Sequence, residues 1–247
     1  MPRFLLVLDD FQVIHESAIL QAIERLLANQ PQNVHLVLVT REDPPLPLAR
    51  LRANNQMTEI RAADLRFTAR EAERFLQEVL GLSLSQADVA VLAERTEGWI
   101  VGLQLAGLSL RDRADPSQFI AGLSGSHRYI LGYLTEQVLG RQPEATTSFL
   151  LQTSILDKLT GDLCAAVTGR ADSAAVLERL FGANLFLVSL DDEQRWYRYH
   201  HLFAGLLANR LQRSLPAPAI RGLHARAAAW LAQNGFLDEA VHHALAG

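Results

Sequence analysis

The sequence predicts an α/β segment followed by an all-α region, and three observations carry this prediction. Two apolar runs, "FLLVL" from Phe4 and "VHLVLV" from Val34, flank one amphipathic segment, which is the pattern of parallel strands joined by a helical crossover. After about residue 67, apolar residues recur at helical rather than strand spacing. Toward the C-terminus, several helical patterns are followed by a short stretch in which apolar and polar residues alternate, which predicts a β-hairpin.

The first segment is expected to place polar side chains at one edge of a parallel sheet. Its helix, within "HESAILQAIERLLANQ", ends before Pro31, and the two strands should be buried on both faces. Asp9 and Asp10 follow the first strand, and Thr40 and Arg41 follow the second. Ligands of open α/β sheets bind at the carboxyl ends of such strands, so this edge is a candidate site.

The change to an all-helical region is expected near residue 67. Residues 57–67, "MTEIRAADLRF", are predicted to form a final strand and an exit from the sheet. Thr68 and Glu71 then have the T-x-x-E spacing of a capping box, and Ser85 with Asp88 marks another helix start. The apolar segment "WIVGLQLAGLSL" predicts a further helix.

The C-terminal half is predicted to hold a winged helix and a helical hairpin. Helical patterns at 129–139, 143–153, 161–167 and 173–181 precede the predicted hairpin in "FLVSLDDEQRWYRYH". After "SLPAPA", which reads as a linker, two helices around Asn234 and Gly235 resemble one tetratricopeptide-type unit.

Composition excludes several classes of function. The net charge of -4 gives no chain-wide basic footprint for nucleic acid, and no apolar run is long enough to span a membrane, so we expect a cytoplasmic protein with no membrane partner. Cys164 is the single cysteine, which excludes a disulfide framework. Lys158 is the single lysine and no glycine precedes it at the required spacing, so the chain contains no phosphate-binding G-x-x-x-x-G-K-[ST] loop.

The motifs, taken in their order along the chain, resemble those of a known family. The series "LLVLDDF", "HLVLVTRED", "LRFTAREAERFL", "EGWIVGLQLAGLSL", "SILDKLTGDLCAAVTG", "YRYHHLF" and "GFLDEAVHHALAG" is similar to the MalT-type regulators, which are bacterial signal-transduction ATPases with numerous domains and usually end in a LuxR-type DNA-binding module. In that family a P-loop half precedes the "LLVLDD" strand, and helical repeats follow the last helices. We therefore expect the chain to be an excerpt that runs from Walker B to the first repeat.

The resemblance implies four domains. Residues 1–67 would be the C-terminal half of a P-loop NTPase domain, 68–126 a helical lid, 127–214 a winged helix, and 215–247 the first helical repeat. It implies ATP or ADP with Mg²⁺ as cofactors when the P-loop half is present, and none for the isolated chain, which should be inactive although the family hydrolyses ATP slowly. It also implies a small-molecule inducer and self-association through further repeats, and DNA binding through a C-terminal helix-turn-helix domain.

Five residues match functional positions of the family. Asp9 would hold Mg²⁺ and Asp10 would orient the attacking water, because Mg²⁺ prefers carboxylate oxygens and keeps several waters. Arg41 would sense the terminal phosphate by donating two parallel hydrogen bonds from its guanidinium to the phosphate oxygens. His200 would contact the β-phosphate of ADP and hold the inactive form, and Gly98 would lie near the adenine.

Each of these residues also has a structural interpretation. The two aspartates could cap a turn, Arg41 could pair with a neighbouring carboxylate, and His200 could make a structural hydrogen bond at the base of the wing. Ile100 stands where the wider class has a proline, so the adenine contact of Gly98 departs from its pattern.

Two other functions remain open at this point. The chain could be a non-catalytic interaction scaffold that binds no nucleotide, an alternative favoured by the missing P-loop. A winged-helix DNA binder has less support, because the expected recognition helix "SAAVLERLF" offers only Arg179 as a basic residue.

Overall fold

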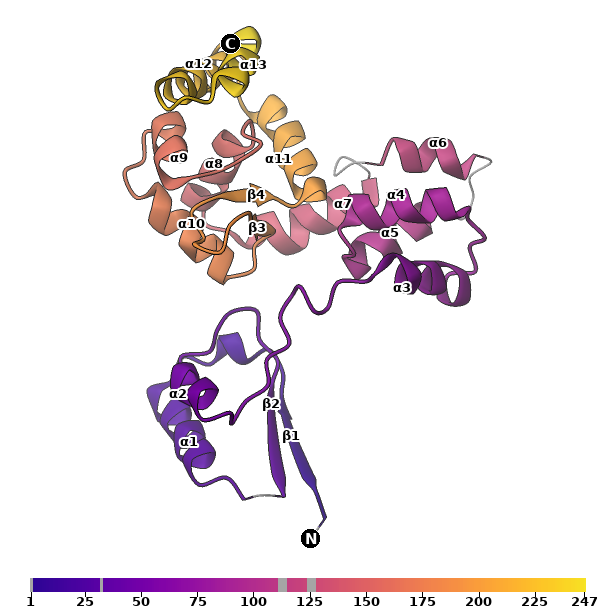
Figure 1. Ribbon diagram of the computed structural model, residues 1–247, viewed down its shortest axis with the longest axis vertical. Coiled ribbons are helices and arrows are strands. Elements are labelled where there is room, and N and C mark those ends of the chain that lie inside the picture. Colours follow the sequence, from indigo (N-terminus) through magenta and orange to yellow (C-terminus); the bar gives the residue numbers. More distant parts are fainter. Residues whose placement is uncertain (1, 32, 111–114, 124–127) are drawn as a thin grey trace. The chain divides into compact units, whose positions relative to one another are not determined.

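The computed structural model describes residues 2–31, 33–110, 115–123 and 128–247, which form two compact units (Figure 1). The first unit comprises residues 1–61 and 182–184, and the second comprises residues 62–181 and 185–247. Within the described ranges, no helix combines the length and the apolar character needed to cross a membrane.

The first unit is a small parallel sheet with its helical crossover, as the sequence predicts. Strands β1 (Phe4–Leu8) and β2 (Val34–Leu38) pair in parallel, with Leu8 opposite Leu38. Helix α1 (Ser17–Ala28) connects them, and α2 (Leu48–Ala53) follows β2. A single 3₁₀ turn, Phe11–Val13, leaves the end of β1.

The sheet of the first unit buries only one of its faces in the described residues. Helices α1 and α2 lie on the same side of β1 and β2 (Figure 1), and Phe11, Ile23 and Leu51 form the small core. On the other face Leu5 and Val7 are 61% and 51% exposed. The expectation that both faces are buried is therefore wrong for this part of the chain, because both helices cover one side.

The predicted strand at residues 57–67 is also wrong. The segment runs through irregular and turn conformations, and in the described part of the first unit only β1 and β2 pair. Ion pairs hold its beginning instead: Glu59 contacts Arg52 and Arg61, and Arg61 also contacts Asp43. Alternating apolar residues form a strand only where a neighbouring edge can pair with their backbone groups.

The second unit begins with helices in the segment predicted to be a helical lid, and this helical segment is named the lid for that prediction. The two predicted helix starts are confirmed: Thr68 Oγ1 accepts the Glu71 N–H while a Glu71 carboxylate oxygen accepts the Thr68 N–H, and Ser85 Oγ accepts the Asp88 N–H. The helical elements of this part, in chain order, are α3 (Ala69–Arg74) with a π-helical turn (Phe75–Val79), α4 (Gln86–Thr96), α5 (Ile100–Leu110), α6 (Pro116–Ala121) and α7 (Arg128–Tyr133), which continues as a π-helical turn (Leu134–Val138) and a 3₁₀ turn (Leu139–Arg141).

The remainder of the second unit contains the predicted helices and hairpin. Its elements are α8 (Glu144–Thr153), α9 (Gly161–Thr168), α10 (Ser173–Gly182), the antiparallel strands β3 (Leu187–Ser189) and β4 (Tyr197–Tyr199), α11 (His201–Ser214), α12 (Ala217–Gln233) and α13 (Leu237–Ala246). Helix α11 was not predicted, although Leu202, Leu206 and Leu207 are buried at helical spacing. The predicted linker "SLPAPA" shrinks to Leu215 and Pro216, because α12 starts at Ala217.

One hydrophobic core runs through the whole second unit. Buried side chains from Ala72 in the lid to Ala240 in the last helix belong to a single cluster. Cys164 lies inside it, and burial raises the pKa of its thiol to about 12. The predicted boundary between residues 126 and 127 lies outside the described residues.

A backbone contact joins the start of the lid to the end of α4. The Phe67 N–H donates to the Gly98 carbonyl oxygen at 2.9 Å. Gly98 has φ +70°, and a Cβ atom added there would lie 2.4 Å from the Phe67 carbonyl oxygen. Only glycine fits this approach without displacing the backbone of residue 67.

Replacement of this glycine should cost more than the unusual φ alone. Gly81 has nearly the same φ, +69°, but open space around its Cα. We expect Gly81→Ala to lower the free energy of unfolding by about 1 kcal/mol and Gly98→Ala by about 3 kcal/mol or more, because only the second adds a clash. Urea unfolding of both variants measures the difference. Equal losses would show that the Phe67 contact does not constrain Gly98.

Candidate functional site

The predicted acidic site lies where the two parallel strands end. Beyond the register pair Leu8 and Leu38, the Val39 N–H donates to the Leu8 carbonyl at 2.9 Å, and the Phe11 N–H donates to the Val39 carbonyl at 3.0 Å. These bonds continue the pairing past both strands. Asp9 and Asp10 therefore leave β1 at the same edge at which Arg41 follows β2.

Gln12 connects the acidic end of β1 to the backbone of Arg41. Its Nε2 donates to Asp10 Oδ1 at 2.9 Å, and its Oε1 accepts the Arg41 N–H at 3.2 Å. Asp10 itself has φ +51°, in the left-handed region, and its N–H donates to Asp9 Oδ1 at 2.8 Å. The structure thus links the Asp9–Asp10 turn, through Gln12, to the backbone of Arg41 at the sheet edge that the sequence analysis singled out; Gln12 itself was missed.

The donor set at this edge suits a hydrated hard cation. Asp9 and Asp10 are exposed carboxylates, and the contacts above occupy only Oδ1 of each. Mg²⁺ takes oxygen ligands, retains several waters and usually needs only one or two protein carboxylates beside substrate phosphates. In the described residues no group of three or more His, Cys, Asp or Glu side chains could hold a metal without such phosphates.

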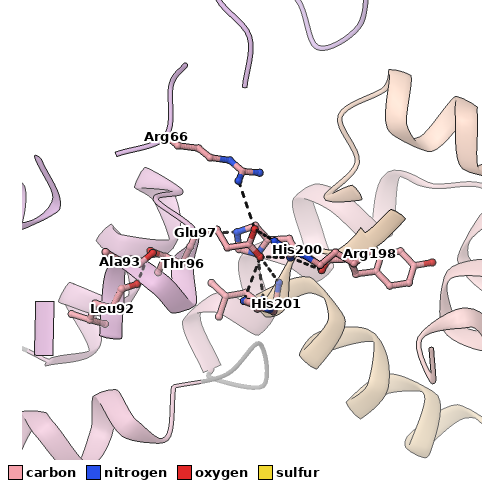
Figure 2. Close-up of polar contacts among 10 residues, drawn as sticks. Arg66, Leu92, Ala93, Thr96, Glu97, Arg198, His200 and His201 are labelled. Carbon is pink, nitrogen blue, oxygen red and sulfur yellow. Dashed lines mark hydrogen bonds and ion pairs between the residues drawn. The ribbon is translucent and has the colours of Figure 1, made fainter. Parts of the chain in front are cut away.

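A second polar site, centred on Glu97, joins the lid to the winged helix (Figure 2). Glu97 ends α4 with φ +50°, and its side chain is only 7% exposed. Arg198 of β4 donates to both carboxylate oxygens, at 2.7 and 2.8 Å, and the backbone N–H of His201 donates to Oε1 at 3.0 Å. Arg66 Nη1 lies 3.7 Å from Oε2. The carboxylate is therefore a meeting point of three segments.

The pKa of Glu97 reflects the competition between burial and these partners. Burial alone raises the pKa of the carboxyl, but the hydrogen bonds from Arg198 and from the His201 N–H favour the charged form. The net effect lowers the pKa from 4.5 to about 2. Glu97 is ionised at neutral pH, and its charge is compensated by the two-pronged guanidinium of Arg198.

His200 lies beside Glu97 with both ring nitrogens occupied. Its Nε2 is 2.9 Å from the Thr96 carbonyl oxygen, which can only accept, so Nε2 carries the hydrogen. Its Nδ1 accepts the Leu202 N–H at 3.3 Å and thereby caps α11. The side chain is buried, and this burial lowers the pKa of the imidazole. The ring is therefore a neutral, internally bonded group in this structure.

Aromatic rings enclose the imidazole. Trp99 packs against His200, Phe186 and Tyr133, with ring centroids 6.1, 5.1 and 5.7 Å apart. Trp99 is therefore a packing residue at the start of α5, as its apolar sequence context indicates. Gly98, predicted to lie near an adenine, places its carbonyl against the backbone of Phe67.

Sequence reasoning missed Glu97 and Arg198. Glu97 opens the quoted segment "EGWIVGLQLAGLSL" and Arg198 lies in "YRYHHLF", so both lay beside residues already singled out. Their pairing spans 101 positions in the chain, and no local pattern reveals such a partner. The one local signal is an ionisable side chain directly before a glycine that ends a helix.

Comparisons with known proteins identify similar sequences. Residues 135–219 match the family model of the MalT winged helix domain. The serine/threonine-protein kinase PknK of Mycobacterium tuberculosis H37Rv is 38% identical over 244 residues, which is 99% of this chain and 22% of that protein. The HTH-type transcriptional regulator MalT of Klebsiella pneumoniae strain 342 is 36% identical over 98% of this chain, and MalT of Yersinia pestis Pestoides F is equally similar. The chain spans about a quarter of the length of these relatives.

The low pKa of Glu97 predicts a specific pH dependence of stability. A carboxyl whose pKa is lower in the folded state stabilises above its unfolded pKa, and this contribution is lost as the pH falls from 4.5 toward 2. We expect Glu97→Gln to lower the free energy of unfolding by about 3 kcal/mol at pH 7, and the loss to shrink over that acidic range. Urea unfolding at several pH values measures both quantities.

The matched control is Glu94→Gln, which removes an exposed carboxylate from the same helix. It should change stability by less than about 0.5 kcal/mol at any pH. A constant difference between wild type and Glu97→Gln from pH 7 to pH 2 would contradict the assignment of the low pKa to Glu97.

Proposed function

Since this chain is MalT-like over nearly its whole length, we propose that it supplies the nucleotide-switch core of a bacterial transcription regulator. The observation that carries the proposal is the edge of the parallel sheet where Asp9, Asp10 and Arg41 meet through Gln12. This edge offers carboxylate oxygens for a cation, and the backbone of Arg41, whose guanidinium could bind a phosphate, is anchored at the same edge.

The residues of this edge have distinct proposed roles. Asp9 would hold Mg²⁺, which supplies neutralisation of phosphate charge when it is bound with a nucleotide. Asp10 would orient water, and its own carboxylate is held in place by the amide of Gln12. Arg41 would donate parallel hydrogen bonds to a terminal phosphate. The hydrogen bond from the Arg41 backbone N–H to Gln12 Oε1 joins the segment after β1 to the segment after β2.

His200 would report the nucleotide state to the winged helix. Its Nε2–H already donates to Thr96, and its Nδ1 accepts from Leu202. A phosphate could take the Nε2–H only in exchange for the Thr96 carbonyl, at the end of α4. Binding of ADP would then alter the joint between lid and winged helix, which is the element a switch must bias.

The wider roles of such a regulator follow as proposals from its relatives. The similar MalT proteins are named HTH-type transcriptional regulators. We expect a small-molecule inducer to favour the ATP-bound form, which would self-associate and bind DNA through a helix-turn-helix domain. If inducer-dependent DNA binding is lost when Asp9 and Asp10 are both mutated, the proposed order of steps is supported. Undiminished DNA binding would contradict it.

One observation favours a second function, that of an interaction scaffold without nucleotide. The chain contains no G-x-x-x-x-G-K-[ST] motif, and the lysine and backbone donors of that loop supply most contacts to phosphates. Under this alternative, the sheet edge would be a structural turn and the Glu97 site a fixed joint.

An ATP titration separates the two functions. For the 247-residue chain alone we expect a dissociation constant above about 1 mM, and for a native gene product that also holds a P-loop we expect micromolar affinity. Isothermal titration calorimetry with Mg²⁺ and ATP measures both. A gene product that does not bind ATP would leave the scaffold as the better account.

The role of Asp10 is tested in the same native gene product. Asp10→Asn should reduce ATP hydrolysis by about 100-fold or more while ATP still binds. The reason is that a side-chain amide, unlike a carboxylate, is too weak a base to activate the attacking water. Glu42→Gln, which alters an exposed carboxylate after β2, is the control and should leave hydrolysis unchanged. Unimpaired hydrolysis by Asp10→Asn would remove Asp10 from the mechanism.

A further inference from the structure

Two histidines connect α12 to α13 at the C-terminal end of the second unit. His224 of α12 and His243 of α13 have their Nδ1 atoms 2.8 Å apart, and their ring centroids are 5.0 Å apart. The two helices pack side by side as an antiparallel hairpin (Figure 1). None of the sites described above includes these two side chains.

The hydrogen bond between the two rings needs one donor and one acceptor. In the neutral pair, one Nδ1 carries a hydrogen and donates it to the lone pair of the other Nδ1. A single added proton preserves this arrangement, because the charged ring donates and the neutral ring accepts. A second proton ends it, because two Nδ1–H groups then face each other and both rings are positively charged.

Burial makes the second proton costly. His243 is buried and His224 is partly buried. Burial is the main cause that lowers the pKa of both imidazoles, and the charge of His242 lowers both further. Two groups that share a proton in this way titrate as a pair. The pair therefore takes up its second proton below the ordinary histidine pKa of 6.5.

Other charged groups stand on the elements packed around the pair. Asp157, in the segment between α8 and α9, raises the pKa of His243 and so opposes the effect of burial. Further charged side chains on these elements are exposed or have other partners: Lys158 with Glu239, Arg226 with the Val167 carbonyl, and the exposed Asp162, Arg213, Arg221 and Asp238. Asp157 is thus the carboxylate that favours a charged His243.

Helix α13 has little else to hold its C-terminal half on α12. Its buried residues are Ala240 and His243, and an alanine buries much less apolar surface than a leucine. Phe236 anchors the start of the helix by stacking on Trp230, whereas Leu245 in the last turn is exposed. The contact between the two histidines is therefore a main anchor of the later turns of α13.

We propose that the His224–His243 pair is an acid-sensitive contact that holds α13 on α12. When both imidazoles are protonated, their hydrogen bond is lost and the two like charges drive the later turns of α13 away from α12. The release would uncover Ala240 and the surface of α12 that α13 covers. This contact is separate from the proposed nucleotide switch and does not rest on it.

The sign of the pH dependence follows from the direction of the pKa values. Because burial lowers the pKa of both imidazoles in the folded hairpin, the open form binds more protons as the pH falls below 6.5. The hairpin is therefore at full stability above that pH and loses stability below it.

Hydrogen exchange of the 247-residue chain tests this contact. Protection factors of the α13 amides, corrected for the intrinsic pH dependence of exchange, should fall by about 10-fold or more between pH 7.5 and pH 5. His200, whose pKa burial also lowers, caps α11, so the amides of α11 report any separate acid effect of that residue. An α13 loss no larger than that of α11 would overturn the proposal.

A substitution that keeps an acceptor but cannot carry the second proton tests the residues. In His224→Asn the amide oxygen can accept the Nδ1–H of His243 whether or not that ring is charged. The α13 protection of this variant should change by less than about 3-fold over the same pH range. His242→Asn, at an exposed position of the same helix, is the control and should lose α13 protection at acid pH as the wild type does. The same acid loss in His224→Asn would contradict the proposal.

A histidine NMR titration of the wild-type chain needs no variant and decides the matter if His224→Asn does not dock α13. The second protonation of the pair and the loss of α13 protection should have midpoints within about 0.5 pH unit of each other, because one event causes the other. A larger difference would show that the two histidines do not control α13 and would overturn the proposal.

Discussion

The buried carboxylate of Glu97 is the contact on which the joint between lid and winged helix depends. It stands at the end of α4, and it receives both prongs of Arg198 from β4 and the first N–H of α11. A buried charge is tolerated only when it is paired and hydrogen-bonded. The lid and the winged helix therefore supply each other's missing partners, and the orientation of β4 and α11 toward α4 follows from that exchange.

The same joint between the lid and the winged helix also fixes the position of the His200 imidazole. The imidazole lies beside Glu97, donates to the last residue of α4 and caps α11 with its other nitrogen. A histidine with two internal partners is a structural group unless a ligand competes for one of them. In the proposed switch the competitor is a phosphate, and its effect would pass directly to the Glu97 contact a few ångströms away.

The elements that could be predicted from the sequence are those with local signals. The capping box at Thr68, the Ser85 helix start and the turn at Gly235 are short-range patterns, and the structure contains each of them. The strand predicted at residues 57–67 failed because a strand also needs a partner edge, which its own residues do not encode. That Asp10 and the backbone of Arg41 lie at one sheet edge followed from strand order, whereas the Gln12 bridge and the Glu97–Arg198 pair depend on contacts between distant segments.

The coupling energy between Glu97 and Arg198 tests this account most directly. A double-mutant cycle with Glu97→Gln, Arg198→Met and the double variant, followed by urea unfolding at pH 7, isolates that energy. The account predicts a coupling of about 2 kcal/mol or more, because the buried Glu97 carboxylate loses its two-pronged partner when Arg198 is replaced. Additive effects within about 0.5 kcal/mol would show that the two side chains do not hold the lid and the winged helix together.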